Sequence, residues 1–506
     1  MKTKAVLRML GVVAGFAILA LCVTDPAWAK VPDQPSDVYV RGYQLMVSRR
    51  IKNNKLEPAK PYIIKGVGWN PATKAPTYGL DPFRGAPYIL PYGFFLYDPV
   101  HNPRAAEVLK YWLEKEHYKN FSPDATMIRR MNANTVRILS VSTDIPMKVL
   151  DKFYRKHIMV IMTVALTKSD FDSGKYLQVV NKYKNHPAIL MWVIGNGWNA
   201  DLYGGTMPDR GTAIKYTYDA GLAIKNADNH HPVSTCLSAD DMHDFIGMIV
   251  VPNIDVIGVN LYRGASFGDF FRVYEQLNSA RPFYFCEFGG DSFKVTGYTA
   301  DAGRAKNCVG AEDQQAQSDF DLGLWRETRP NLSAYDYRKR CLGGLVREYA
   351  DQVWKVGNYH VGLGGIIDYD HYPTSKAYYI YNPEGFIRPG MPDGTTSEEY
   401  FGVVTSDHKA KVVYSALKAF YLTLGAPYIA SVTPEAKIGQ PFTITGVGFG
   451  DTQGQGTVMV GSTLAAVVSW ADGSITCTTP NVTKRGHPVV VNAAGTDSNS
   501  EKLKVK

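Results

Sequence analysis

The sequence has few of the features that mark metal-binding, nucleic-acid-binding or membrane-spanning proteins. Its 506 residues include only 6 cysteines and contain no Cys-x-x-Cys pair or histidine cluster, so we expect no metal site and see no sign of another cofactor. The net charge is only +8 and the basic residues are scattered, which argues against a nucleic-acid partner. After residue 29 no run of about 18 apolar residues occurs, so we expect no membrane span in the mature chain.

The first 29 residues have the pattern of an export signal. Basic residues precede an apolar run over 9–23, and Ala27-Trp28-Ala29 follows it. A basic start, an apolar middle and a small-x-small end are typical of a secretory signal peptide, here residues 1–29. We therefore expect export to the periplasm or the cell exterior.

Export places the cysteines in an oxidising compartment, where disulfides form. Cys308 and Cys341 flank one polar, loop-rich segment, so they are the pair best suited to a disulfide. Cys236 and Cys286 lie in apolar runs, which predicts buried thiols.

Between residues 60 and 425, short apolar runs alternate with helical stretches. Eight runs fit strands, namely 62–69, 134–141, 158–166, 188–196, 232–239, 254–262, 282–290 and 364–372. Such runs are typical of parallel strands buried on both faces. Eight of them with intervening helices predict an α/β fold, a (β/α)8 TIM barrel. An open doubly wound sheet is the alternative, but no Gly-x-Gly-x-x-Gly turn follows the first run.

Two segments of this barrel domain, residues 30–425, depart from the pattern. Residues 30–60 are polar, which predicts irregular structure. Residues 291–345 are too long for a barrel connection and predict an insertion on the face where barrels carry their sites. This insertion is either a wall or lid of a cleft, or a tolerated surface addition.

Residues 426–506 change in character. They are rich in Thr, Val and Gly, with alternating polarity and the turns "DTQGQG" and "ADGS", which predicts an immunoglobulin-like β-sandwich. The segment resembles an IPT/TIG domain, and the resemblance rests on Ile429, Ser431-Val432, Pro434, Gly439, residues 443–446, Gly448-Phe449, Val458 and "ITCTTP". It implies a fold and no chemistry.

The order of four stretches in the barrel region resembles the barrels of clan A glycoside hydrolases, especially those of families two and five. The stretches are "IIKGVGWNP" (63–71), "DATMIRRMNANTVRI" (124–138), "HPAILMWVIGN" (186–196) and "RPFYFCEFGGDS" (281–292). The resemblance implies an enzyme that cleaves O-glycosidic bonds of a polysaccharide or oligosaccharide.

The resemblance also assigns roles to residues at the ends of the strands. Glu287 would be the nucleophile that forms a glycosyl-enzyme, and Arg137 would hold it ionised. Asn196 would bind the sugar 2-hydroxyl. The other expected substrate-binding residues are Tyr262, Trp69, Trp198 and Asp368.

Gly197 stands where the family has the glutamate that acts as acid and base, and glycine cannot transfer a proton. A displaced acid is one interpretation, with Asp370 as first candidate because "IIDYDHY" places two carboxylates and a histidine together. Two other interpretations remain open: a catalytically inactive carbohydrate-binding protein, and a transglycosylase or substrate-assisted enzyme. A structural surface protein is the blandest alternative. Other candidates for the acid are Asp201, Asp240, Asp241, His243 and Glu312.

Overall fold

The computed structural model describes residues 31–69, 121–139, 141, 143, 145–197, 209–239, 245–246, 249–298, 308–351, 372–373, 395–396, 400–405, 408–450, 452–471, 473–493 and 495–506. None of the helices in this part of the chain is both long and apolar enough to cross a membrane.

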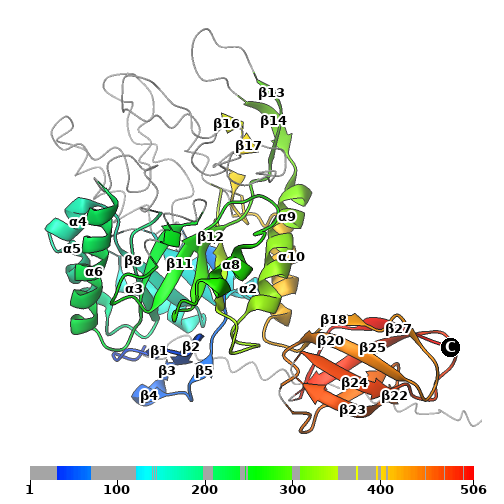
Figure 1. The fold of residues 1–506 in the computed structure, drawn as a ribbon. Helices are drawn as coiled ribbons and strands as arrows, with labels where there is room; N and C mark the ends of the chain where they lie inside the picture. Colours follow the sequence, from blue (N-terminus) through cyan, green and yellow to red (C-terminus); the bar gives the residue numbers. More distant parts are fainter. Residues whose placement is uncertain are drawn as a thin grey trace, which may run out of the picture. The chain divides into compact units, whose positions relative to one another are not determined.

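A closed barrel of eight parallel strands forms the centre of the larger domain (Figure 1). In chain order the strands are β6 (Ile64–Gly68), β7 (Thr135–Ile138), β8 (Met159–Ala165), β9 (Ile189–Ile194), β10 (Val233–Ser238), β11 (Val256–Asn260), β12 (Phe283–Phe288) and β15 (Cys341–Val346). Every residue of β8 and β9 is buried, as expected for strands covered on one face by helices and on the other by the barrel interior. The predicted TIM barrel is confirmed.

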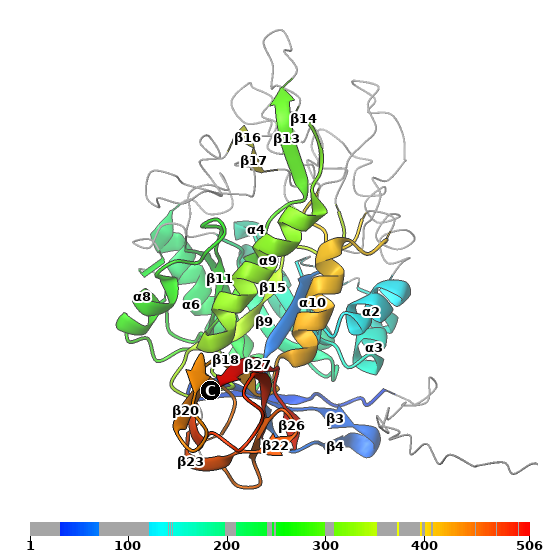
Figure 2. The same ribbon diagram turned by 90° about the vertical axis from the view of Figure 1, so that its right-hand side faces the viewer.

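Helices cover the outside of the barrel (Figure 1). They are α2 (Phe121–Arg130), α3 (Met147–Arg155), α4 (Lys168–Asp172), α5 (Lys175–Tyr183), α6 (Arg210–Ala227), α8 (Phe270–Gln276), α9 (Gln314–Thr328) and α10 (Val412–Thr423), with short 3-10 turns η1 (Lys52–Asn54) and η3 (Arg329–Asn331). Asp209 and Asp313 cap α6 and α9 by accepting from backbone N–H groups of the first turn. Helices α9 and α10 lie side by side (Figure 2).

The prediction of the eighth strand was wrong. The barrel closes through β15, which pairs with β12 on one side and with β6 on the other. The run "CLGGLV" was overlooked because two glycines weaken its strand pattern. Yet Gly343 has a φ of +108°, and a Cβ there would lie 2.1 Å from the carbonyl oxygen of Ile64, so the close pairing with β6 requires glycine. Most of the predicted run, 364–371, lies outside the described residues.

The stretch 291–345 is therefore only partly an insertion. It contains β13 (Phe293–Tyr298) and β14 (Cys308–Glu312), which pair as an antiparallel hairpin, and then α9, a regular helix of the barrel. A separate pair of two-residue strands, β16 (Tyr372–Pro373) and β17 (Thr395–Thr396), follows later in the chain.

The expected disulfide between Cys308 and Cys341 does not form. Cys341 is a buried free thiol at the start of β15, where it pairs with Phe283 of β12. Burial raises the pKa of this thiol to about 12, so it stays protonated and unreactive. The side chain of Cys308 lies outside what the structure describes.

The irregular structure expected for residues 30–60 was also wrong in part. Strands β1 (Asp37–Arg41), β2 (Gln44–Ser48) and β5 (Lys60–Pro61) form a small antiparallel sheet, and β3 (Arg50–Ile51) pairs with β4 (Lys55–Leu56). Val38 and Leu45 of this sheet join one apolar cluster with Ile64 and Met159, which lie at the starts of barrel strands. The sheet therefore closes the N-terminal end of the barrel.

The C-terminal domain is a sandwich of two sheets. One contains β18 (Tyr428–Val432), β20 (Pro441–Val447), β24 (Ser474–Thr478) and β23 (Ala466–Ala471); the other contains β19 (Glu435–Ala436), β27 (Glu501–Val505), β25 (Gly486–Ala493), β21 (Thr457–Val460) and β22 (Thr463–Leu464), with β26 (Thr496–Asp497) paired to β25. Inward-facing residues such as Ile444, Val458 and Val491 are fully buried and alternate with exposed ones, which is the pattern of an immunoglobulin-like sandwich.

Candidate active site

Arg137 joins the two polar side chains that were expected to perform the chemistry. It is the last residue but one of β7, close to the C-terminal side of the barrel, and its side chain is 2% exposed. Nη1 donates to Glu287 Oε1 at 3.1 Å, and Nη2 donates to Asn196 Oδ1 at 3.0 Å. One rigid guanidinium fork therefore fixes the positions of both Glu287 and Asn196 relative to each other.

Asn196 has a defined amide orientation. Its Oδ1 accepts from Arg137, from Asn260 Nδ2 at 3.1 Å and from the Cys236 thiol at 3.2 Å. Because a guanidinium can only donate hydrogen bonds, the atom that faces Arg137 must be the amide oxygen. The amide nitrogen is thereby left as the donor to other groups, which is the role a sugar hydroxyl requires.

Glu287 is held at both carboxylate oxygens. Oε1 accepts from Arg137, and Oε2 accepts from the Tyr262 hydroxyl at 3.2 Å. The Arg347 guanidinium adds an ion pair to Oε2 at 3.9 Å. The Glu287 side chain keeps 12% of its surface exposed, so a fixed carboxylate remains open on one side.

The interior beneath these groups is closed and keeps Arg137 charged. Burial alone would lower the pKa of Arg137, but neighbouring groups, among them the Glu287 carboxylate, hold it above the ordinary arginine value. Burial raises the pKa of the Cys236 thiol as well. That thiol stays protonated and lies 3.2 Å from Asn196 Oδ1 and 3.0 Å from Asn260 Oδ1, so its single S–H is shared between the two amide oxygens.

The turn after β9 has a backbone that favours glycine at position 197. Gly195 and Gly197 flank Asn196 with φ values of +83° and +67°, and the Gly197 N–H donates to the carbonyl of Cys236 at 2.8 Å. An L-residue adopts this left-handed backbone only at a cost. A glutamate at 197 is therefore disfavoured by the backbone that presents Asn196.

Three residues of the site escaped the sequence reasoning. Asn260 and Cys236 lie at or near the ends of correctly predicted strands, so their positions in the sequence could have identified them as site residues. Arg347 follows β15, and it was missed because the eighth strand was assigned elsewhere.

Trp69 was expected at the substrate, but the structure places it in the core. Its side chain packs edge-on against Phe153 at 4.9 Å and donates to Asp124 at 3.0 Å, and the residue is 2% exposed. An indole buried on both faces cannot stack on a sugar ring. The prediction failed because the residue after β6 turns back toward α2.

The remaining predicted residues are distributed as follows. Glu312 ends β14, where it accepts from Ser292 at 3.2 Å and from Gln314 at 2.9 Å; no contact with Glu287 is seen among the described residues. Residues outside the described part of the chain are Trp198, Asp201, Asp240, Asp241, His243, Asp368 and Asp370. Within the described part, no group of three or more His, Cys, Asp or Glu side chains is arranged to hold a metal ion.

Two family models match the chain. Residues 174–383 match the model of the glycosyl hydrolases family 2 TIM barrel domain, and residues 427–505 match that of the IPT/TIG domain. Both resemblances found in the sequence are confirmed. A cyclomaltodextrin glucanotransferase from Thermoanaerobacterium thermosulfurigenes is 32% identical over 116 residues, which is 20% of this chain and 16% of that protein.

Solved structures similar to this chain include family 2 glycosidases. A β-galacturonidase from Eisenbergiella tayi bound to galacturonate is 15% identical with a TM-score of 0.41, over 77% of this chain and 54% of that one. A β-glucuronidase from Bifidobacterium dentium complexed with coumarin-3-O-glucuronide is 16% identical with a TM-score of 0.43, over 76% and 49%. The chain thus spans about half the length of these structures and a small part of the curated relative.

Proposed function

From a barrel that matches the glycosyl hydrolases family 2 model, we propose that this protein hydrolyses O-glycosidic bonds of an oligosaccharide or polysaccharide, with Glu287 as nucleophile. The observation that carries the proposal is the fork of Arg137, which holds Glu287 at 3.1 Å and Asn196 at 3.0 Å. A nucleophilic carboxylate and a donor for the 2-hydroxyl are the two groups that retaining cleavage needs on this side of the sugar.

The mechanism assigns one step to each group. Glu287 attacks the anomeric carbon while the bond to the leaving oxygen breaks, and the result is a covalent glycosyl-enzyme. Asn196 donates its amide N–H to the 2-hydroxyl, a contact that strengthens in the transition state. Water then attacks the anomeric carbon and releases Glu287.

The proton for the leaving group must come from a residue other than Gly197. Our candidates are Asp370 first, then Asp201 and Glu312. Loss of general acid assistance typically costs about 10²–10⁴-fold in rate, and the cost is largest for poor leaving groups. We therefore expect activated aryl glycosides to be cleaved far faster than alkyl glycosides if no acid replaces the usual glutamate.

A 2-fluoro-glycoside with a dinitrophenolate leaving group tests the nucleophile directly, because it needs little acid assistance. We expect mass spectrometry to find one adduct on Glu287 with one of the glucosyl, galactosyl, mannosyl or glucuronyl forms. The Glu287→Gln variant should give no adduct. Glu275→Gln is the matched control, because Glu275 lies on α8 and pairs with Lys339 at 2.9 Å on the barrel exterior.

The absence of a side chain at 197 favours one second candidate function, a carbohydrate-binding protein without catalysis. The same experiment separates the two. No adduct with any sugar, together with measurable binding of glycans by calorimetry, would decide for the binding protein.

The proposed site of action is outside the cytoplasm, in the periplasm or beyond. The support is the pattern of residues 1–29. Sequencing of the N-terminus of the exported protein should find residue 30 as its first residue; an intact N-terminus would contradict this proposal.

A further inference from the structure

A short segment that does not belong to the barrel strands lies against the ends of two of them. We call residues 400–405 the strap. The Val403 N–H donates to the carbonyl of Glu348 at 2.9 Å, and the Glu348 N–H donates to that of Phe401 at 3.1 Å. A Cβ on Gly402 would lie 2.1 Å from the backbone nitrogen of Asp351. The strap therefore lies in direct backbone contact with the chain that follows β15.

Phe401 of the strap contacts Tyr262 and Arg347, two residues that lie beside Glu287. Its ring meets Tyr262 edge-on with centroids 6.5 Å apart, and the Arg347 guanidinium lies 5.3 Å from its centre. Tyr262 and Arg347 are the two partners of Glu287 Oε2. Phe401 is fully buried, so both contacts are shielded from water, which strengthens the cation–π attraction.

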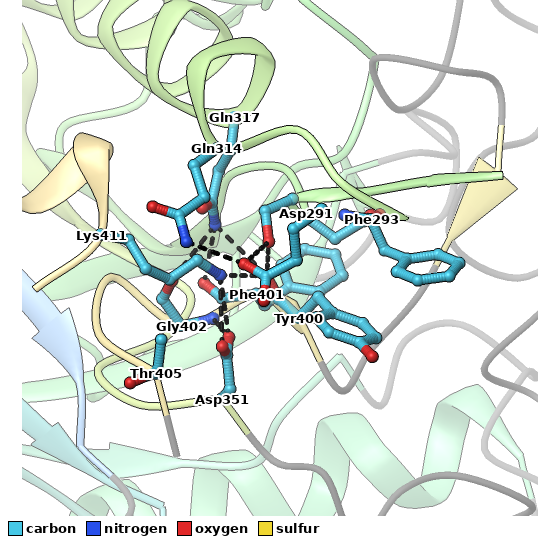
Figure 3. Close-up of polar contacts among 12 residues, drawn as sticks. Asp291, Phe293, Gln314, Gln317, Asp351, Tyr400, Phe401, Gly402, Thr405 and Lys411 are labelled. Atoms are coloured by element: carbon cyan, nitrogen blue, oxygen red, sulfur yellow. Dashed lines mark hydrogen bonds and ion pairs between the residues drawn. The ribbon is translucent and has the colours of Figure 1, made fainter. Parts of the chain in front are cut away.

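Buried polar groups lock the strap in place (Figure 3). Lys411 Nζ donates to the Tyr400 carbonyl at 3.0 Å and pairs with Asp351 at 3.0 Å. Asp351 accepts from the Gly402 N–H at 2.8 Å. Gln317 Nε2, which comes from α9, lies 3.3 Å from the carbonyl oxygens of both Phe401 and Gly402.

The contacts of the strap include buried charges, which a segment that only covers apolar surface does not need. Asp351 and Lys411 are 3% and 1% exposed, and burying such charges is costly unless each is paired and hydrogen-bonded. Here the paired charges hold the backbone on both sides of Phe401. The arrangement fixes one ring against Tyr262 and Arg347.

We propose that Phe401 is a positioning residue for the reaction, which orients the Tyr262 hydroxyl and the Arg347 guanidinium toward Glu287. The inference rests on the proposed role of Glu287 as nucleophile. Phe401 acts through its two neighbours and touches no substrate. Misplacement of a catalytic group by about 1 Å can cost up to about 10²-fold in rate, so loss of this ring should slow the attack by roughly 10–100-fold.

The test is the Phe401→Leu variant, which keeps an apolar side chain of similar size and removes the ring. We expect the rate constant for labelling by the activated 2-fluoro-glycoside to fall about 10–100-fold, with the loss in kcat rather than in KM on the matching aryl glycoside. Phe270→Leu is the control, because Phe270 of α8 is also fully buried and packs on Phe283 and Phe285. The control should lose as much thermal stability and keep its labelling rate.

Two results would overturn the inference: labelling of Phe401→Leu at the wild-type rate, or equal rate losses in both variants. A crystal structure of Phe401→Leu tests the inference independently of the proposed function, because it needs no activity. The Tyr262 Oη to Glu287 Oε2 distance, 3.2 Å in the intact chain, should lengthen. If wild-type protein is never labelled, the proposed function fails, and this distance alone decides whether Phe401 positions Tyr262.

Discussion

Both ends of the barrel contain deeply buried residues, but these residues are opposite kinds of side chain. At the N-terminal end, Val38 and Leu45 pack with Ile64 and Met159 into one apolar cluster. At the C-terminal end, Arg137 is as deeply buried, yet it is surrounded by carboxylate, amide and thiol groups. The same eight strands run from one end of the barrel to the other.

Along each strand, the residues at one end therefore serve mainly stability, and those at the other end serve mainly the proposed chemistry. Apolar groups at one end stabilise the fold in proportion to the surface they bury. Polar groups at the other end are tolerated because each has a partner, and such networks fix positions more than they add stability. Substitutions at the two ends should therefore have different signatures.

The largest effect is expected for Arg137→Met, which removes the cation that the C-terminal end is built around. Breaking a buried ion pair from one side costs about 3–5 kcal/mol of unfolding free energy, because Glu287 and Asn196 each lose one donor and Glu287 loses its closest cation. Labelling of Glu287 by the 2-fluoro-glycoside should be lost as well. Chemical unfolding and mass spectrometry measure the two effects.

The double variant Arg137→Met/Glu287→Gln is the control for this prediction. It removes both members of the buried pair, so it should regain part of the lost stability without regaining labelling. Equal stability of wild type and Arg137→Met would contradict the importance of the pair.

Leu45→Ala tests the opposite end. Leu45 is fully buried, and such truncations cost about 2–5 kcal/mol because they lose apolar contacts and leave a cavity. At temperatures where the variant is folded, its labelling rate should match that of wild type. A loss of labelling in the folded variant would show that packing at the N-terminal end also controls the site, and the contrast between the two ends would not hold.

The sequence was a good guide to the fold wherever strands were continuous apolar runs. The seven predicted runs before residue 291 all contain a barrel strand, because burial on both faces leaves a simple signature. The eighth did not follow that signature: β15 has Gly343 and Gly344 in its middle, where Ile64 and Phe285 approach too closely for a side chain. Close packing between strands leaves no trace in a one-dimensional pattern.

The site was predictable to the extent that strand ends were. Arg137, Asn196, Tyr262 and Glu287 were found because each lies within two residues of the end of a correctly assigned strand, and the structure brings all four together. The part played by Phe401 could not be inferred, since it depends on contacts with Tyr262 and Arg347, which lie far from it along the chain. Those contacts exist only after the chain has folded.

Gly197→Glu should have a smaller effect. Adding a side chain to a residue with a left-handed backbone lowers the free energy of unfolding by about 1–2 kcal/mol. We expect no faster cleavage of alkyl glycosides, because the backbone at 197 is shaped to present Asn196. Gly42→Glu is the matched control at the N-terminal end, with a φ of +59° and nothing within 4 Å. Both variants should lose similar stability in thermal unfolding. An acceleration of about 10²-fold or more in Gly197→Glu alone would show that only the side chain of the acid was lost.

A pH dependence should also separate the two ends. Burial raises the pKa of Asp351 from 3.8 to about 7, while the ion pair with Lys411 opposes the shift and Glu312 adds to it. A carboxyl whose folded pKa is raised contributes stability that is fully present below the unfolded pKa and is lost as the pH rises through the folded one. The free energy of unfolding of wild type, relative to Asp351→Asn/Lys411→Met, should therefore decline between about pH 4 and pH 8. The corresponding difference for Leu45→Ala should stay constant, because this substitution removes no titratable group. Urea unfolding at several pH values measures both, and parallel curves would mean that Asp351 does not titrate in this range.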